Sequence, residues 1–153
     1  MATKPARREV VYADTSFLFS LYLRDANTAG ATAYVAQQAP ALVLTSWQRC
    51  ELRNAIRLAV ARGNTTPELA RQALADIEAD TAAGDLVATA LVWPDLYETA
   101  ENLSETHTAK LGVRTLDLLH VAAALNLSAT AFLSFDARQF ALAMAAGLNF
   151  VRP

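Results

Sequence analysis

The chain has 153 residues, 54% of them hydrophobic, which predicts one folded, helix-rich domain over residues 1–153 and excludes a disordered chain. Its net charge of −2 combines eleven arginines and two lysines with 15 acids, so binding a polyanion requires a local arginine patch or metal ions. No apolar run approaches the ~20 residues of a membrane span, no leader sequence is evident, and one cysteine excludes an internal disulfide, so we expect a reducing, cytoplasmic location.

In the first half of the chain, two apolar runs alternate with helical segments. Residues 10–13 (VVYA) are typical of a buried strand, and helices are predicted at 16–23 and 28–38. A second apolar run at 41–45 leads into a helix that begins with a hydroxyl cap and ends near residue 62.

The same alternation continues to the end of the chain. Thr66 and Pro67 are typical of a helix start, and that helix is predicted to reach about residue 82. The remaining predicted elements are a strand at 86–93, a helix from 94 to about 111, a helix from 115, a strand at 131–135, a helix at 137–147 and a strand at 148–151. Strands that alternate with helices predict an α/β fold with three layers, α/β/α, and a mainly parallel central sheet.

Four acids follow predicted strands at the same end. Asp14 ends the first strand, and Asp136 follows the strand at 131–135. Asp117 lies in the first turn of its helix, and Glu51 lies in the second turn of the helix after residues 41–45. Because ligands of parallel α/β sheets bind beyond the carboxyl ends of the strands, we expect the four side chains to converge there.

Converging carboxylates repel one another unless a cation lies between them. Carboxylate oxygens without histidine or cysteine favour Mg²⁺ or Mn²⁺, and such a site can promote phosphoryl displacement. An aspartate after a strand is, however, also a common helix N-cap, and Glu51 alone is typical of a solvated helix residue. The prediction of a metal site therefore depends on all four acids occurring together.

Four segments in order resemble the PIN-domain ribonucleases, particularly the small VapC-type toxins of prokaryotic toxin–antitoxin pairs. The segments are VVYADTS, RCELRNA, RTLDLLHVAAAL and AFLSFDARQ, and together they cover nearly the whole chain. By this resemblance Asp14, Glu51, Asp117 and Asp136 correspond to the four acids of the family. The resemblance implies a Mg²⁺- or Mn²⁺-dependent endoribonuclease that cuts single-stranded or loop RNA, forms a homodimer and is inhibited by an antitoxin protein. A PIN-fold RNA-processing nuclease without an antitoxin, and a module that binds RNA or a partner without cutting, are the alternatives.

Polar neighbours of the acids are candidates for a supporting role. Thr15, Ser16 and Ser134 are expected either to fix the carboxylates by hydrogen bonds or to cap the local backbone. Asn54, one turn after Glu51, also fits the family pattern.

Arginines flank the predicted site. Arg49, Arg53 and Arg57 form a stripe on the helix of Glu51, while Arg114 and Arg138 lie beside the third and fourth acids. Arg49, Arg53, Arg114 and Arg138 are candidates for contact with RNA phosphates. A solvated basic face, or ion pairs with nearby acids, is the alternative.

Three other features have more than one interpretation. His120 is three residues after Asp117, where a metal ligand is conceivable, but its apolar neighbours favour a packing histidine. Cys50 is expected to be a small buried residue. The segment FLFSLYL, residues 17–23, is either a surface for a partner or a helix with core on two sides.

Two other acid-bearing enzyme classes are excluded by missing residues. A phosphoaspartate receiver needs an acid pair on its first strand and a lysine near the end, and the lysines here are Lys4 and Lys110. A haloacid-dehalogenase-type phosphatase needs a second aspartate two residues after the first, where this chain has Ser16.

Overall fold

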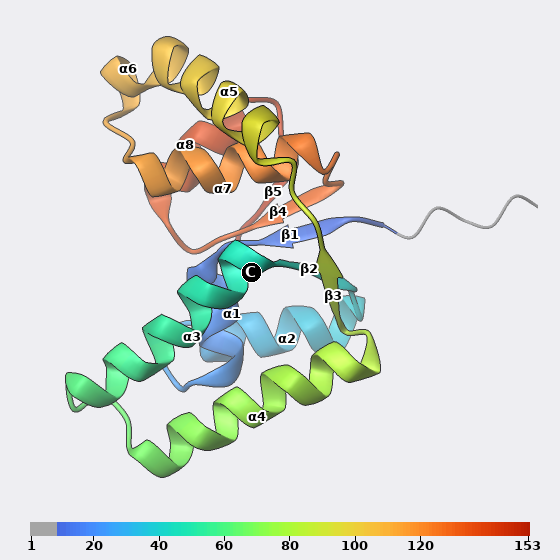
Figure 1. The fold of residues 1–153 in the computed structure, drawn as a ribbon, viewed down its shortest axis with the longest axis vertical. Helices are drawn as coiled ribbons and strands as arrows, with labels where there is room; N and C mark the ends of the chain where they lie inside the picture. The colour runs from blue at the N-terminus through green and yellow to red at the C-terminus, as the bar shows by residue number, and fades with distance from the viewer. Residues whose placement is uncertain (1–8) are drawn as a thin grey trace, which may run out of the picture.

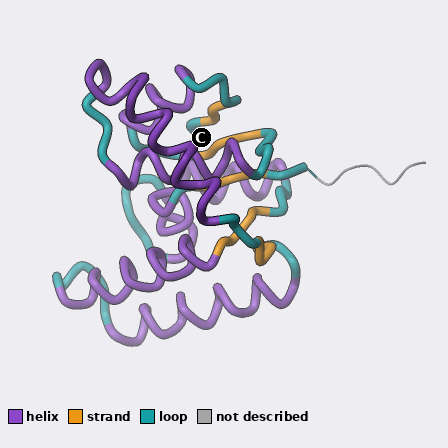
Figure 2. Tube along the Cα trace, turned by 45° about the horizontal axis from the view of Figure 1, so that its top comes forward, coloured by secondary structure: helices purple, strands orange, loops and turns teal. Residues whose placement is uncertain are grey.

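The computed structural model describes residues 9–153, so the expected absence of a leader sequence falls on residues 1–8 and lies outside the described residues. Five strands form one parallel sheet in the order β3-β2-β1-β4-β5 (Figures 1 and 2). The strands are β1(Val11–Ala13), β2(Leu42–Thr45), β3(Leu86–Thr89), β4(Ala131–Leu133) and β5(Phe150–Val151). The chain starts at the central strand, moves outward through β2 and β3, and returns to the other side of β1 for β4 and β5.

Helices cover both faces of the sheet, so the predicted three-layer α/β/α arrangement is confirmed (Figure 1). The first face packs against α1(Thr15–Tyr22), α2(Thr28–Gln38), α3(Ser46–Ala61) and α4(Pro67–Ala83). The second face packs against α5(Trp93–Leu103), α7(Thr115–Asn126) and α8(Ala137–Ala145). Between α5 and α7 the chain forms a π-helical turn, η1(Ser104–Thr108), and the short α6(Ala109–Leu111).

The two cores follow from the two-residue period of the strands. Val11 and Ala13 belong to the core on the side of α1–α4, whereas Tyr12 between them belongs to the other core. On β4, Leu133 and Phe132 divide in the same way. Central strands that are apolar on both faces are expected of a parallel sheet covered on both sides.

Several predicted bounds differ from those observed, and the last strand, predicted at 148–151, covers only Phe150–Val151. The strand predicted at 86–93 ends at Thr89, because Trp93 already begins α5. The helix predicted from 94 to 111 is interrupted by η1, within which the Thr106 hydroxyl donates to the Asn102 carbonyl oxygen. The strand predicted at 131–135 ends at Leu133, after which the chain turns into the cap of α8.

The structure also decides two of the ambiguous features. Phe17 and Leu18 are fully buried in α1, and the other large residues of this segment pack against the same core, so α1 is a core helix. Cys50 is exposed on α3, so the prediction of a buried cysteine was wrong. Within residues 9–153, no helix is both long enough and apolar enough to cross a bilayer.

The starts of three helices lie directly at the carboxyl ends of strands. Asp14 connects β1 to α1, and Thr45, the last residue of β2, caps α3. The fully buried Gln48 donates to the Ala13 carbonyl oxygen at 2.7 Å and so ties the start of α3 to the end of β1. Asp136 lies between β4 and α8. The edge of the sheet where these helices begin therefore carries acids from distant parts of the chain.

Candidate active site

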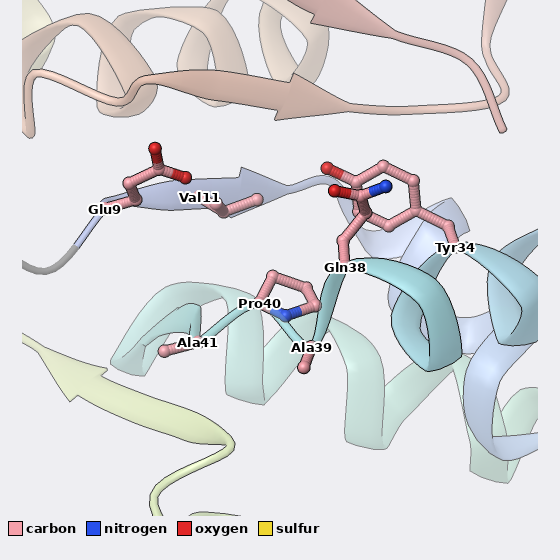
Figure 3. A pocket seen from close by; sticks show the side chains of 7 residues that line it. All are labelled: Glu9, Val11, Tyr34, Gln38, Ala39, Pro40 and Ala41. Atoms are coloured by element: carbon pink, nitrogen blue, oxygen red, sulfur yellow. The ribbon is translucent and has the colours of Figure 1, made fainter.

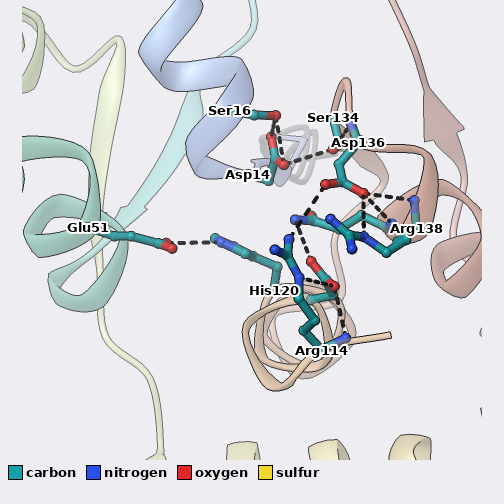
Figure 4. Close-up of polar contacts among 10 residues, drawn as sticks. Asp14, Ser16, Glu51, Arg114, His120, Ser134, Asp136 and Arg138 are labelled. Carbon is teal, nitrogen blue, oxygen red and sulfur yellow. Dashed lines mark hydrogen bonds and ion pairs between the residues drawn. The ribbon is translucent and has the colours of Figure 1, made fainter. Parts of the chain in front are cut away.

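Asp14 and Asp117 are the most buried of the four acids, each being 1% exposed. Asp14 lies at the end of β1. Its carboxylate accepts hydrogen bonds from the Phe17 backbone N–H at 2.9 Å and from the hydroxyls of Ser16 and Ser134, both at 2.8 Å (Figure 4). Asp14 is thus a helix N-cap, as the conservative interpretation held. Its hydrogen-bond partners within the described residues are neutral. When Asp14 is ionised, its negative charge is therefore buried without a positive partner, which is unfavourable.

Glu51 projects from the second turn of α3 toward α7. Its Oε2 atom lies 3.0 Å from Nε2 of His120 and also accepts a hydrogen bond from the Thr15 hydroxyl. Figure 4 shows the Glu51 and His120 side chains pointing toward one another. The Glu51 side chain is 26% exposed, so it is partly accessible to solvent.

Asp117 and Asp136 are connected by an arginine. The Arg114 guanidinium lies 3.3 Å from Asp117 through Nε and 3.9 Å from Asp136 through its terminal nitrogen (Figure 4). Asp117 also accepts the Arg114 backbone N–H at 2.9 Å, and Asp136 caps α8 by accepting the Arg138 backbone N–H at 2.8 Å. Both aspartates lie at helix N-termini, where backbone amides and the helix dipole favour a negative charge.

One residue of this site was not identified from the sequence. Gln139 is 6% exposed, and its Nε2 lies 3.4 Å from Asp117 while its backbone N–H donates to Asp136 at 3.3 Å. It therefore connects the third and fourth acids from the first turn of α8. Its Oε1 is buried and accepts no hydrogen bond from the described residues. The sequence signal was its place three residues after an N-cap aspartate, a position where a glutamine commonly turns back toward the cap.

The surroundings of the acids shift their pKa values in different directions. Burial raises the pKa of Asp14 above its ordinary value, although the hydrogen bonds from Phe17, Ser16 and Ser134 act in the opposite direction. For Glu51, burial is the largest single influence and acts to raise the pKa, but the opposing influences, which include the hydrogen bonds from His120 and Thr15, together lower it. The pKa of Asp117 is lowered as well, because the hydrogen bonds and charge of Arg114 outweigh burial. The negative charge of Asp117 acts to raise the pKa of Glu51, so these two acids influence each other.

The donors fit a hard divalent cation by their chemistry. All four are carboxylates, and the buried Asp14 accepts hydrogen bonds only from neutral donors within the described residues, so its negative charge has no partner there. In the described residues, no three side chains of His, Cys, Asp and Glu are grouped closely enough to hold an ion together. Instead the positive charge of Arg114 lies between Asp117 and Asp136. The guanidinium therefore competes with a cation for these two aspartates.

Replacing Arg114 by glutamine is therefore expected to strengthen Mn²⁺ binding, because the competing positive charge is removed. The Arg114 side chain is 61% exposed, so the gain is small, up to about fivefold in the dissociation constant. Isothermal titration of Mn²⁺ measures it. The matched control is Arg71→Gln, which removes an arginine paired with Glu68 on the surface. Weaker binding by the Arg114 variant than by the control would contradict this role.

The other predicted site residues divide into two groups. Thr15, Ser16 and Ser134 all donate to the acids, as described above. Asn54, in contrast, is exposed and makes no hydrogen bond to the four acids within residues 9–153.

The predicted RNA-binding arginines also divide. Arg49 and Arg53 both pair with one oxygen of Glu78, the former at 2.7 Å, so in these two cases the ion-pair alternative describes their contacts. Arg114 and Arg138 remain beside the acids, with Arg138 3.8 Å from Asp136 (Figure 4).

A cavity of about 220 Å³ lies at the opposite end of the sheet. Its lining comes from the amino ends of β1 and β2 and from the end of α2, and comprises Glu9, Val11, Tyr34, Gln38, Ala39, Pro40 and Ala41 (Figure 3). Because the four acids follow the carboxyl ends of the strands, this cavity belongs to a different part of the molecule.

A family model described as the PIN domain matches residues 11–144. No curated protein matches the sequence. Among solved structures, VapC20 from Mycobacterium tuberculosis, described as a toxin that cleaves the sarcin–ricin loop, is 24% identical. Its TM-score is 0.65, and the match covers 94% of this chain and 99% of that one.

Two further structures match over similar lengths at lower identity. VapBC-1 from nontypeable Haemophilus influenzae is 15% identical with a TM-score of 0.61, covering 94% of this chain and 97% of that one. FitAcB from Neisseria gonorrhoeae is 14% identical with a TM-score of 0.57, covering 92% and 95%. At these identities the likeness shows a shared fold.

Proposed function

The chain belongs to the PIN domain family, and on that basis we propose that it is a divalent-metal-dependent endoribonuclease and the toxin of a toxin–antitoxin pair. The PIN-like α/β/α fold agrees with the resemblance carried by its sequence motifs. The observation that carries the proposal is Asp14, a buried carboxylate whose donors in the described residues are all neutral, at an edge shared with three other acids. The names of the structural neighbours, which include VapBC and FitAcB, support a toxin with an antitoxin partner.

In this proposal each acid has a defined task. Asp14, Asp117 and Asp136 hold Mg²⁺ or Mn²⁺, and Glu51 either completes this shell or orients the attacking water as a general base. A bound divalent ion supplies a low-pKa water and charge for the phosphodiester oxygens. The hydroxyls of Ser16 and Ser134 hold both oxygens of Asp14 in place.

The arginines beside the acids position the substrate. Arg114 and Arg138 are 61% and 47% exposed and lie within 4 Å of Asp136, so we assign RNA phosphate contact first to these two. Arg49 and Arg53 would have to leave Glu78 to contribute. The substrate class is single-stranded or loop RNA.

Partners and compartment follow from the same proposal. An antitoxin protein would cover the acidic edge, and the toxin would be a homodimer in the cytoplasm. The one cysteine of the sequence, Cys50, is an exposed thiol, which suits a reducing compartment.

The test is cleavage of structured and unstructured RNA by partner-free protein with Mg²⁺, Mn²⁺ or EDTA. We expect discrete cuts that require the metal and disappear in Asp117→Asn, with the fold of the variant checked by circular dichroism. A folded wild type that binds no metal and cuts no RNA would leave a partner-binding PIN module. Cleavage without an antitoxin gene beside the coding sequence would favour an RNA-processing nuclease.

A further inference from the structure

A chain of hydrogen bonds leads from the core of the protein to Glu51. The Tyr12 hydroxyl lies 2.9 Å from Nδ1 of His120, and Nε2 of the same ring lies 3.0 Å from Oε2 of Glu51. Tyr12 is fully buried on the central strand, and His120 is 2% exposed on α7. The Trp47 ring, centred 4.4 Å from the imidazole, packs against it from α3. The imidazole is therefore held by three elements of the fold.

The positions of the protons follow from these contacts. Burial raises the pKa of Tyr12 well above its ordinary value, so its hydroxyl keeps its proton. His120 is its hydrogen-bond partner within the described residues, and a buried hydroxyl without an acceptor is costly, so Tyr12 donates to Nδ1. Nε2 faces a carboxylate and must carry a proton to bind it. Both ends of the ring thus specify the same tautomer, protonated on Nε2.

This arrangement distinguishes the two oxygens of Glu51. Oε2 receives both available donors, Nε2 of His120 and the Thr15 hydroxyl. Oε1 receives none from the described residues, while the side chain as a whole is 26% exposed. Oε1 is consequently the oxygen free to bind a cation or accept a proton from water. Because both nitrogens of His120 are engaged, the ring is not itself available as a metal ligand.

We propose that His120, oriented by Tyr12, is a positioning residue that fixes the Glu51 carboxylate with Oε1 directed to the reaction. The inference rests on the proposed function, in which Glu51 completes the metal shell or orients water. It replaces the interpretation of His120 as a residue that only packs. Partners that orient metal-ligating or catalytic side chains change activity by about 10- to 100-fold when removed.

Matched substitutions separate orientation from packing. In His120→Gln the side-chain amide can still donate to Glu51, whereas in His120→Asn the amide is too short to reach it. We expect the asparagine variant to lose about 10- to 100-fold in kcat with KM unchanged, and the glutamine variant to recover most of the loss. Tyr12→Phe, which leaves Nδ1 without its donor, should lower kcat in the same direction. His107→Asn is the control, since His107 lies in η1 and is the only other histidine.

The tautomer is measured without any reaction. With selective ¹⁵N-histidine labelling and EDTA present, two-bond ¹H–¹⁵N spectra of the two histidines report which ring nitrogen carries the proton. We expect an unprotonated Nδ1 in His120, and assign its signals by their loss in His120→Gln. An unprotonated Nε2 overturns the proposal, because His120 could then not donate to Glu51, and so does equal kcat in His120→Asn and wild type. If the wild type cuts no RNA, the proposed function fails, and the spectrum still decides the proton arrangement.

Discussion

Replacing Asp14 by asparagine is expected to lower kcat for RNA cleavage by roughly 100- to 1000-fold while leaving the fold intact. Metal-assisted stabilisation of charge is worth several kcal/mol, and each 1.36 kcal/mol changes the rate about tenfold. The asparagine keeps an oxygen for the Phe17 N–H, and the hydroxyls of Ser16 and Ser134 can rotate to accept from its amide. Loss of activity therefore should not be accompanied by loss of structure.

In metal-free protein the same variant should be more resistant to urea than the wild type at neutral pH. The folded-state pKa of Asp14 is raised by burial, so the folded protein binds this proton more tightly than the unfolded chain does. The stabilisation from the proton is present below the unfolded pKa and is lost as pH rises through the folded pKa. Asparagine cannot ionise. The difference in urea midpoint, variant minus wild type, should therefore grow as pH rises from the acidic range toward neutrality.

The effect on kcat is measured by RNA cleavage assays with metal present. The effect on stability is measured by urea titrations in EDTA at several pH values. Asp95→Asn is the matched control, because Asp95 is also an aspartate in the first turn of a helix but is exposed and outside the site. It should change neither kcat nor the pH dependence. Full activity of the Asp14 variant would remove Asp14 from the metal shell.

Phe132→Ala is expected to have the largest effect on stability, a decrease of about 3–5 kcal/mol in the free energy of unfolding. Phe132 is fully buried on β4, and its ring stacks on Tyr12 with centroids 5.6 Å apart. A domain of this size is stable by only about 5–15 kcal/mol, so this single change removes a large share of the stability.

Phe140→Ala makes the same chemical change on the surface. Phe140 is 46% exposed on α8 and packs edge-on against Phe150, so its loss should cost about 1 kcal/mol. Urea denaturation followed by circular dichroism compares the two. Equal decreases for both variants would contradict the assignment of Phe132 to the core between the sheet and α5–α8.

Most of the fold could be predicted from local patterns. The start of α4 at Thr66 with Pro67 was predicted correctly, and the cap of α3, predicted at Thr45 or Ser46, is Thr45, because caps depend on nearby residues alone. The strand predicted at 86–93 was too long, because an apolar run that crosses the boundary between β3 and α5 has no period to mark it. The π-helical turn at Ser104–Thr108 was missed for a similar reason, since helix patterns do not separate α from π turns.

The site was predictable to a different extent. The placement of Asp14 and Asp136 at one edge follows from the rule that parallel strands end together. The pairing of His120 with Glu51, and of Gln139 with Asp117, depends on how α7, α3 and α8 pack against one another. Apolar neighbours on its own helix therefore described the burial of His120 correctly and could not indicate its partner.

The position of β1 in the middle of the sheet has a consequence for synthesis. Asp14 is synthesised early, yet both of its long-range hydrogen bonds are to residues near the end of the chain. Its backbone N–H donates to the Leu133 carbonyl oxygen, and its carboxylate accepts from the hydroxyl of Ser134, 120 residues later in the sequence. A growing chain that has reached only β3 holds two of the four acids and an unpaired side of β1. Such distant contacts form last. Under the proposed function, a nascent chain at that point lacks Asp117 and Asp136, so its metal site is incomplete until β4 and α8 have been made and have docked.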